Sequence, residues 1–92
     1  MSARGPAGRD YVRAEALRES GYFAKAEALY GSVLRRSRSA ADAALRAEAS
    51  LGSALGLRAV GDTKGAAARL RDARRAAESA GLDLADRIDL EE

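Results

Sequence analysis

The sequence predicts an all-α fold, and three observations carry that prediction. Alanine, the residue with the highest helix propensity, fills 23 of the 92 positions, whereas proline occurs once. Valine and isoleucine together number four, so the chain has few of the residues that favour β-strands. Gly21 and Gly61 each separate two helix-like stretches, which indicates two helical hairpins joined in series.

Five helices are expected in order along the chain. Pro6 suits a first helical turn, where its missing N–H is not needed, and Gly21 ends the first helix as a C′ glycine. The stretch from Phe23 to Arg36 places its apolar residues on one face at the helical period. The expected helices span about residues 6–20, 23–36, 40–60, 63–80 and 83–92.

The third expected helix has two unusual properties. Its apolar residues fall on several faces, which is typical of a helix packed between neighbours. It also contains Gly52 and Gly56, one turn apart, each of which costs ~1 kcal/mol relative to alanine. We therefore expect another backbone to approach this helix closely at the two glycines. Asp62 is expected to cap the helix that follows.

The chain length is that of one small domain. Residues 1–6 are expected to form a flexible tail, and residues 7–92 a helical domain. Within that domain the sequence predicts one hairpin over 7–38, a second over 40–80 and a terminal helix over 83–92.

The two hairpins repeat each other after a shift of forty residues. The matching pairs are Ala14 with Ala54, Leu17 with Leu57, Arg18 with Arg58, Gly21 with Gly61, Ala26 with Ala66, Tyr30 with Leu70 and Val33 with Ala73. Each unit therefore reads as a helix, a glycine turn and a second helix. A self-similar helical hairpin at such a period is typical of an α-solenoid.

The repeated residues resemble the tetratricopeptide repeat family. The first unit carries Ala14, Leu17, Gly21, Phe23, Ala26, Tyr30 and Val33, and the second carries Ala54, Leu57, Gly61, Ala66, Leu70 and Ala73. The resemblance implies an α-solenoid of antiparallel hairpins. Thr63 replaces the aromatic residue of the turn, and the period is forty residues rather than about 34. Another hairpin array or a plain helical bundle is also compatible with these spacings.

Composition excludes several functional classes. The chain has no cysteine and no histidine, and so lacks thiolate metal ligands, disulfides and the commonest general base. The net charge is only +2, and no apolar run is long enough for a membrane span or a signal peptide. We therefore expect a cytoplasmic protein that is not an enzyme and uses no cofactor. The excess of arginine and alanine suggests a bacterial source.

The family resemblance implies a concave binding face formed by the first helix of each hairpin. By helical period the candidate residues on that face are Tyr11, Glu15, Arg18, Glu48, Leu51, Leu55 and Arg58. Arg18 and Arg58 occupy equivalent positions and are candidates to hold an acidic peptide or a terminal carboxylate. The alternative is that both arginines are solvated or paired locally with glutamates of their own helix.

Three charged clusters have two interpretations each. Two are basic, Arg35, Arg36 and Arg38 in one and Arg69, Arg71, Arg74 and Arg75 in the other; the acidic one holds Asp83, Asp86, Asp89, Glu91 and Glu92. The basic clusters could contact phosphate or nucleic acid, but solvated outer helices are the favoured interpretation, and nucleic acid is not expected as a partner. The acidic cluster could pair with a basic helix face of this or another copy, although a solvated terminal helix is favoured.

These observations favour a protein–protein interaction module, an adaptor or regulatory scaffold that binds a protein or peptide. The alternative is a helical self-association module without a peptide groove, which forms a homo-oligomer or is a fragment of a larger regulatory protein. Self-association is considered because two units are fewer than the three or so usually needed to bury a continuous core.

Overall fold

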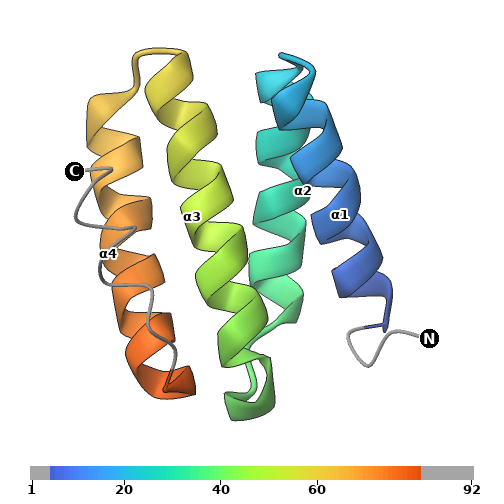
Figure 1. The fold of residues 1–92 in the computed structure, drawn as a ribbon, viewed down its shortest axis with the longest axis vertical. Helices are drawn as coiled ribbons and strands as arrows, with labels where there is room; N and C mark the ends of the chain where they lie inside the picture. Colours follow the sequence, from blue (N-terminus) through green and yellow to red (C-terminus); the bar gives the residue numbers. More distant parts are fainter. Residues whose placement is uncertain (1–4, 82–92) are drawn as a thin grey trace.

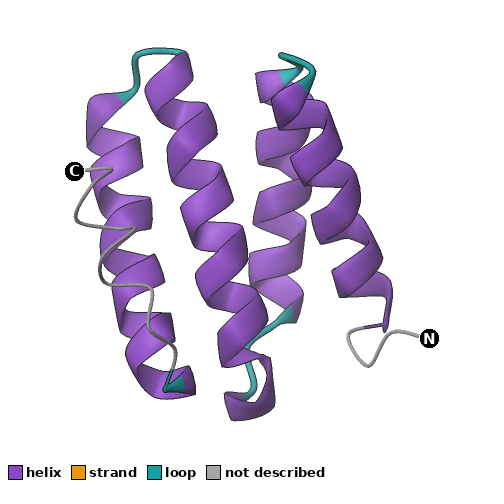
Figure 2. Ribbon diagram, in the orientation of Figure 1, coloured by secondary structure: helices purple, strands orange, loops and turns teal. Residues whose placement is uncertain are grey.

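The computed structural model describes residues 5–81, which form helices joined by short turns (Figure 1 and Figure 2). The elements are α1 (Gly5–Glu19), α2 (Phe23–Arg36), the 3-10 turn η1 (Ala40–Asp42), α3 (Ala43–Ala59) and α4 (Thr63–Ala80). Residues 5–81 contain no β-strand, which confirms the prediction of an all-α fold.

The four α-helices form two antiparallel hairpins that lie side by side (Figure 1). One hairpin consists of α1 and α2, and the other of α3 and α4. The two are joined mainly where α3 packs against α2, with a smaller contact between α1 and α3. Helix α3 lies between α2 and α4 and also contacts α1. Its apolar residues therefore face several directions, as the sequence predicted.

The structure corrects two expected helix boundaries and the expected number of helices. Helix α1 begins at Gly5, so the expected tail of residues 1–6 includes two helical residues. The expected third helix is divided into η1 and α3. In the linker before η1, the carbonyls of Ser37 and Ser39 accept hydrogen bonds from the Arg46 guanidinium at 2.8 Å and 2.6 Å. Residues 5–81 hold four α-helices rather than about five, and the expected terminal helix at 83–92 lies outside the described residues.

The two hairpin turns have the same geometry, as the forty-residue repeat predicts. Gly21 and Gly61 have φ angles of 89° and 86°, in the left-handed region that favours glycine. The N–H groups of Tyr22 and Asp62 donate to carbonyls five residues earlier, each at 2.8 Å. These are the hydrogen bonds of a Schellman motif, so each glycine ends one helix and reverses the chain into the next.

Only the second turn carries a side-chain cap. The Asp62 carboxylate accepts a hydrogen bond from the Gly65 N–H at 2.9 Å, whereas Tyr22 makes no such bond at the start of α2. We expect Asp62→Ala to lower the free energy of unfolding by about 1 kcal/mol, measured by urea denaturation. Asp62→Asn is the control, because asparagine also caps helices; an equal loss in both variants would contradict the capping role.

Small residues occupy the positions where the helices of each hairpin cross. Ala14, Ala26, Ala54 and Ala66 are all buried, as the repeat predicts. Larger side chains then fill the space between helices, and Tyr30 is completely buried against the start of α3. An alanine side chain contributes little apolar area, so close helix packing rather than bulky residues forms this core.

Candidate functional site

Three residues at the interface of α1, α2 and α3 form a hydrogen-bonded network. The Tyr30 hydroxyl donates to the Glu15 carboxylate and accepts from Arg18 Nε at 3.1 Å. Arg18 Nη2 in turn bonds Glu15 Oε1 at 2.8 Å, so the three polar groups satisfy one another. The Tyr11 ring packs against Tyr30 with centroids 6.5 Å apart. Three of the seven expected binding-face residues are therefore engaged within the fold.

Burial at this network shifts the pKa values of two groups. Burial raises the pKa of the Tyr30 phenol well above its ordinary value, and the hydrogen bond to Glu15 raises it further, although Arg18 opposes the shift. For Arg18, burial alone would lower the pKa, but its contacts with Tyr30 and Glu15 outweigh burial and raise it. The phenol therefore stays neutral and the guanidinium charged, as the hydrogen bonds require.

Gly52 of α3 lies directly against this network. A Cβ atom built on Gly52 would lie 2.5 Å from Glu15 Oε2 and 2.6 Å from the Tyr30 hydroxyl oxygen. At Gly56 the nearest atoms, from Arg18 and Phe23, are 3.8–3.9 Å away, which is ordinary contact. The sequence predicted close approach of a backbone at both glycines; the structure instead places two side chains against Gly52 alone.

The other expected binding-face residues lie on α3 and do not complete one open surface. Leu51 is 2% exposed and packs in the apolar core between α3 and α4, so its assignment to the binding face is wrong. Glu48 and Leu55 are partly buried, and Arg58 is exposed. Because α3 packs between α2 and α4, most of its surface is covered. The area of α3 that is left to form the expected concave face is therefore small.

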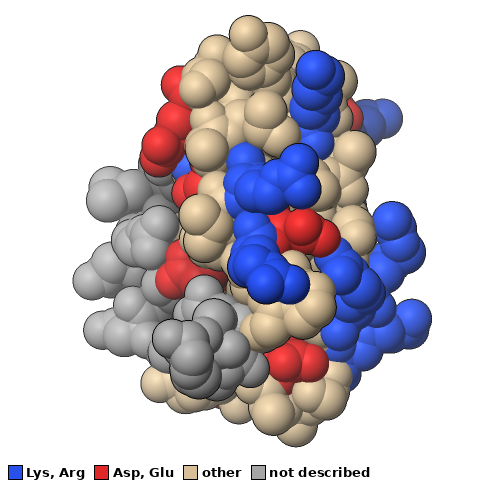
Figure 3. Space-filling model, turned by 90° about the vertical axis from the view of Figure 1, so that its right-hand side faces the viewer, with Lys and Arg blue, Asp and Glu red and all other residues tan. Residues whose placement is uncertain are grey.

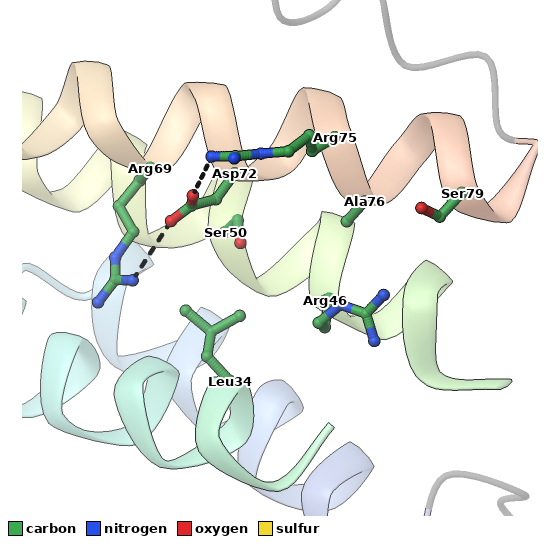
Figure 4. A pocket seen from close by; sticks show the side chains of 8 residues that line it. All are labelled: Leu34, Arg46, Ser50, Arg69, Asp72, Arg75, Ala76 and Ser79. Atoms are coloured by element: carbon green, nitrogen blue, oxygen red, sulfur yellow. Dashed lines mark hydrogen bonds and ion pairs between the residues drawn. The ribbon is translucent and has the colours of Figure 1, made fainter. Parts of the chain in front are cut away.

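Two adjoining hollows lie between α2, α3 and α4 and form one groove. Figure 4 shows the eight residues that line the first of them. Their volumes are about 370 Å³ and 560 Å³, and they share Leu34, Arg46 and Arg69. We call this feature the arginine groove. Its lining residues are Gly31, Leu34, Arg35, Arg38, Arg46, Ser50, Arg69, Asp72, Arg75, Ala76 and Ser79. Five arginines and one aspartate thus line a surface with an apolar centre at Leu34 and Ala76.

Two of the groove arginines are held rigidly by the fold. Arg46 binds the carbonyls of the linker between the hairpins, as described above. Arg69 donates to the Ser53 hydroxyl at 3.0 Å and to Glu27 at 3.3 Å, and Ser53 donates to Glu27 at 2.6 Å. This second network links α2, α3 and α4 beside the groove. The positions of the two guanidinium groups are therefore set before any ligand arrives.

The remaining groove arginines are more exposed. Arg75 pairs with Asp72 at 3.1 Å, and Asp72 also lies 3.8 Å from Arg69 (Figure 4). Arg35 and Arg38 are exposed, and neither forms a hydrogen bond or ion pair with another residue of the described range 5–81. Figure 3 shows Lys and Arg side chains through the middle and along the right-hand edge of the molecular face that lies at the right of Figure 1. The groove therefore has positive charge that partners within residues 5–81 do not neutralise.

Some residues of the arginine groove belong to the basic clusters that the sequence analysis identified, and others do not. Both basic clusters contribute, but Arg36 instead binds Asp10 of α1 and fastens the first hairpin. Arg46 was not identified, although Arg46, Ser50 and Ser53 follow one another at i, i+4 and i+7. This polar stripe in a helix rich in alanine and leucine could have identified Arg46 from the sequence. Ser50 and Ser53 are both buried, beside Arg46 and Arg69.

Comparisons of the chain with family models, with curated proteins and with solved structures find no match. No helix within residues 5–81 has the length and apolar character needed to cross a membrane. The same residues contain no cluster of three or more acidic side chains able to hold a metal ion. The arginine groove is therefore the candidate site of this protein.

Proposed function

We propose that this protein is a protein-interaction module that binds an acidic segment of a partner in the arginine groove. The observation that carries the proposal is the convergence of five arginines, from α2, the linker after it, α3 and α4, on one groove that is lined by a single acid. Guanidinium groups bind carboxylates through paired, charge-assisted hydrogen bonds. Leu34 and Ala76 add an apolar centre on which a short aliphatic side chain can pack.

An acidic peptide fits the groove better than a nucleic acid does. None of the lining residues is aromatic, so the groove offers no platform on which bases could stack. The whole chain carries a net charge of only +2, whereas dedicated nucleic-acid binders are usually far more basic.

We also propose that the two hairpins are tetratricopeptide-like units. The support is the forty-residue repeat and the equal geometry of the turns at Gly21 and Gly61. Repeat arrays of this kind present extended surfaces to partner proteins. In this chain the side of the array formed by α2, α3 and α4 supports the binding site, because Glu15 and Arg18 of the first helix are bound to Tyr30.

The proposal is tested with a fluorescein-labelled hexaglutamate peptide and the double variant Arg35→Glu, Arg38→Glu. We expect the wild-type protein to bind the peptide at low ionic strength and the variant to bind about ten-fold more weakly or not at all, since the variant reverses the charge of two cations that have no ion-pair partner within residues 5–81. Fluorescence anisotropy gives the Kd. Circular dichroism checks that the variant keeps its helices, which is expected because both arginines are exposed.

A control variant makes the same change in charge outside the groove. Arg9→Glu with Lys64→Glu alters two exposed cations that do not line either hollow. The proposal requires this control to retain most of the binding and labelled hexaglutamine to bind neither protein. An equal loss in both double variants would reduce the effect to net charge and overturn the groove. Tighter binding of a short oligothymidylate, lost in the groove variant, would also overturn it.

A further inference from the structure

The arginine groove opens at the end of the molecule where α4 ends. Ser79 lines the groove, and α4 ends at Ala80. Gly81 then adopts the left-handed conformation with φ of 70°, and its N–H bonds the Glu78 carbonyl at 3.2 Å. Such a glycine turns the chain off the helix axis. The residues after Gly81 therefore start within one helical turn of the groove.

The eleven residues from 82 to 92 are complementary to the groove in charge. They contain five acids, Asp83, Asp86, Asp89, Glu91 and Glu92, and one arginine. The groove has the opposite balance, with five arginines and one aspartate. The segment also has apolar residues between its acids at Leu84, Ile88 and Leu90, and the groove has Leu34 and Ala76 between its arginines.

The segment is long enough to reach every part of the groove. Eleven residues span up to about 36 Å when extended. The longest dimension of the molecule is 32 Å, and the groove occupies only part of it. Because the segment is tethered beside the site, its effective concentration there is in the millimolar range for a short flexible connection. Even a weak contact between the two would then be largely formed.

We propose that residues 82–92 occupy the arginine groove of the same chain and compete there with acidic partners. The inference rests on the proposed function for its competitive effect, whereas the contact itself stands on charge and proximity. A partner must then displace the segment before it binds. The apparent Kd for a partner then equals the Kd of the open groove divided by the fraction of molecules whose groove is open.

The contact is tested by paramagnetic relaxation enhancement on the full chain. The sequence has no cysteine, so Ala85→Cys gives one attachment point for a nitroxide label. We expect strong broadening of the amide signals of Leu34 and Arg46, which lie on α2 and α3, and little effect at the exposed Val12 of α1. The broadening should disappear when the five acids of residues 82–92 are replaced by their amides.

The same experiment separates binding within one copy from binding between copies. An isotope-labelled chain without the nitroxide is mixed with an unlabelled chain that carries it. Broadening at Leu34 and Arg46 in this mixture would place the segment in the groove of another copy and overturn the proposal. Equal broadening at Val12 and at the groove, or none at either place, would overturn it as well.

Competition is tested with the labelled hexaglutamate peptide on the wild-type chain and on the five-fold amide variant. If the segment fills the groove in about four of five molecules, the amide variant binds the peptide about five-fold more tightly. Equal affinity, with binding still lost in Arg35→Glu, Arg38→Glu, overturns the inference and leaves the proposed function intact. Absence of peptide binding to both chains overturns the proposed function, and the relaxation data then decide the contact alone.

Discussion

Gly52→Ala is expected to destabilise the protein, although alanine is the better helix former. The new Cβ would meet Glu15 Oε2 at 2.5 Å and the Tyr30 hydroxyl at 2.6 Å, and both groups are held by their bonds to Arg18. Overpacking of this kind costs about 1–3 kcal/mol, while helix propensity returns about 1 kcal/mol. We expect a net loss of up to about 2 kcal/mol in the free energy of unfolding, measured by urea denaturation.

Gly56→Ala is the matched control on the same helix. It makes the same chemical change one turn later, where the nearest atoms are 3.8–3.9 Å from the new Cβ. We expect it to be neutral or to stabilise the protein by up to about 1 kcal/mol, because only helix propensity changes. If both variants gained stability equally, the close packing of Tyr30 and Glu15 against α3 would be disproved.

Tyr30→Phe is expected to have an effect of similar size. The hydroxyl serves as donor to Glu15 and acceptor from Arg18, and Tyr30 is completely buried. Hydrogen bonds to charged groups contribute about 1.5–3 kcal/mol, so we expect a loss in that range at neutral pH. Tyr22→Phe is the control, because Tyr22 is largely exposed and its ring keeps its contact with Lys25. A loss in Tyr22→Phe as large as in Tyr30→Phe would contradict the network.

The same residue predicts how stability changes at alkaline pH. The Tyr30 phenol has a raised pKa in the folded protein, so it holds its proton more tightly there than in the unfolded chain. Its contribution is fully present below about pH 10 and is lost as pH rises from there toward the raised folded pKa. Unfolding free energies measured across this range should fall more steeply for the wild type than for Tyr30→Phe. Parallel curves would show that Tyr30 does not cause the decline.

Helices α2 and α4 could be predicted from sequence down to their end residues. Phe23 and Thr63 each follow a glycine turn, and the conformational preference of glycine is local, so no tertiary information was needed. The region before α3 could not be predicted as well. Residues 40–42 form a 3-10 turn, and Arg46 reaches back to the carbonyls of the linker before it, a contact that depends on the position of a long side chain.

The candidate site was less accessible to sequence reasoning than the fold. Helical period placed Glu15 and Arg18 on one face, but their partner Tyr30 lies on a different helix, and its presence there is a result of tertiary packing. The arginines at 35 and 38 and those at 69 and 75 are more than thirty residues apart along the chain. They share a groove because α2 and α4 both flank α3, which a single sequence does not specify.

The contact of Tyr30 with Gly52 also makes the inner surfaces of the two hairpins different from their outer surfaces. In the forty-residue repeat, Val12 occupies the position in the first hairpin that Gly52 occupies in the second, and Leu70 replaces Tyr30. Val12 is 64% exposed, so the outer side of α1 presents a branched side chain where the internal joint has none. A second copy cannot reproduce the internal joint at this end, because the surfaces no longer match. Within residues 5–81 the contact of Tyr30 with Gly52 therefore occurs once, and the outer side of α1 lacks the glycine that would let a second copy add the same contact and extend an open-ended fibre.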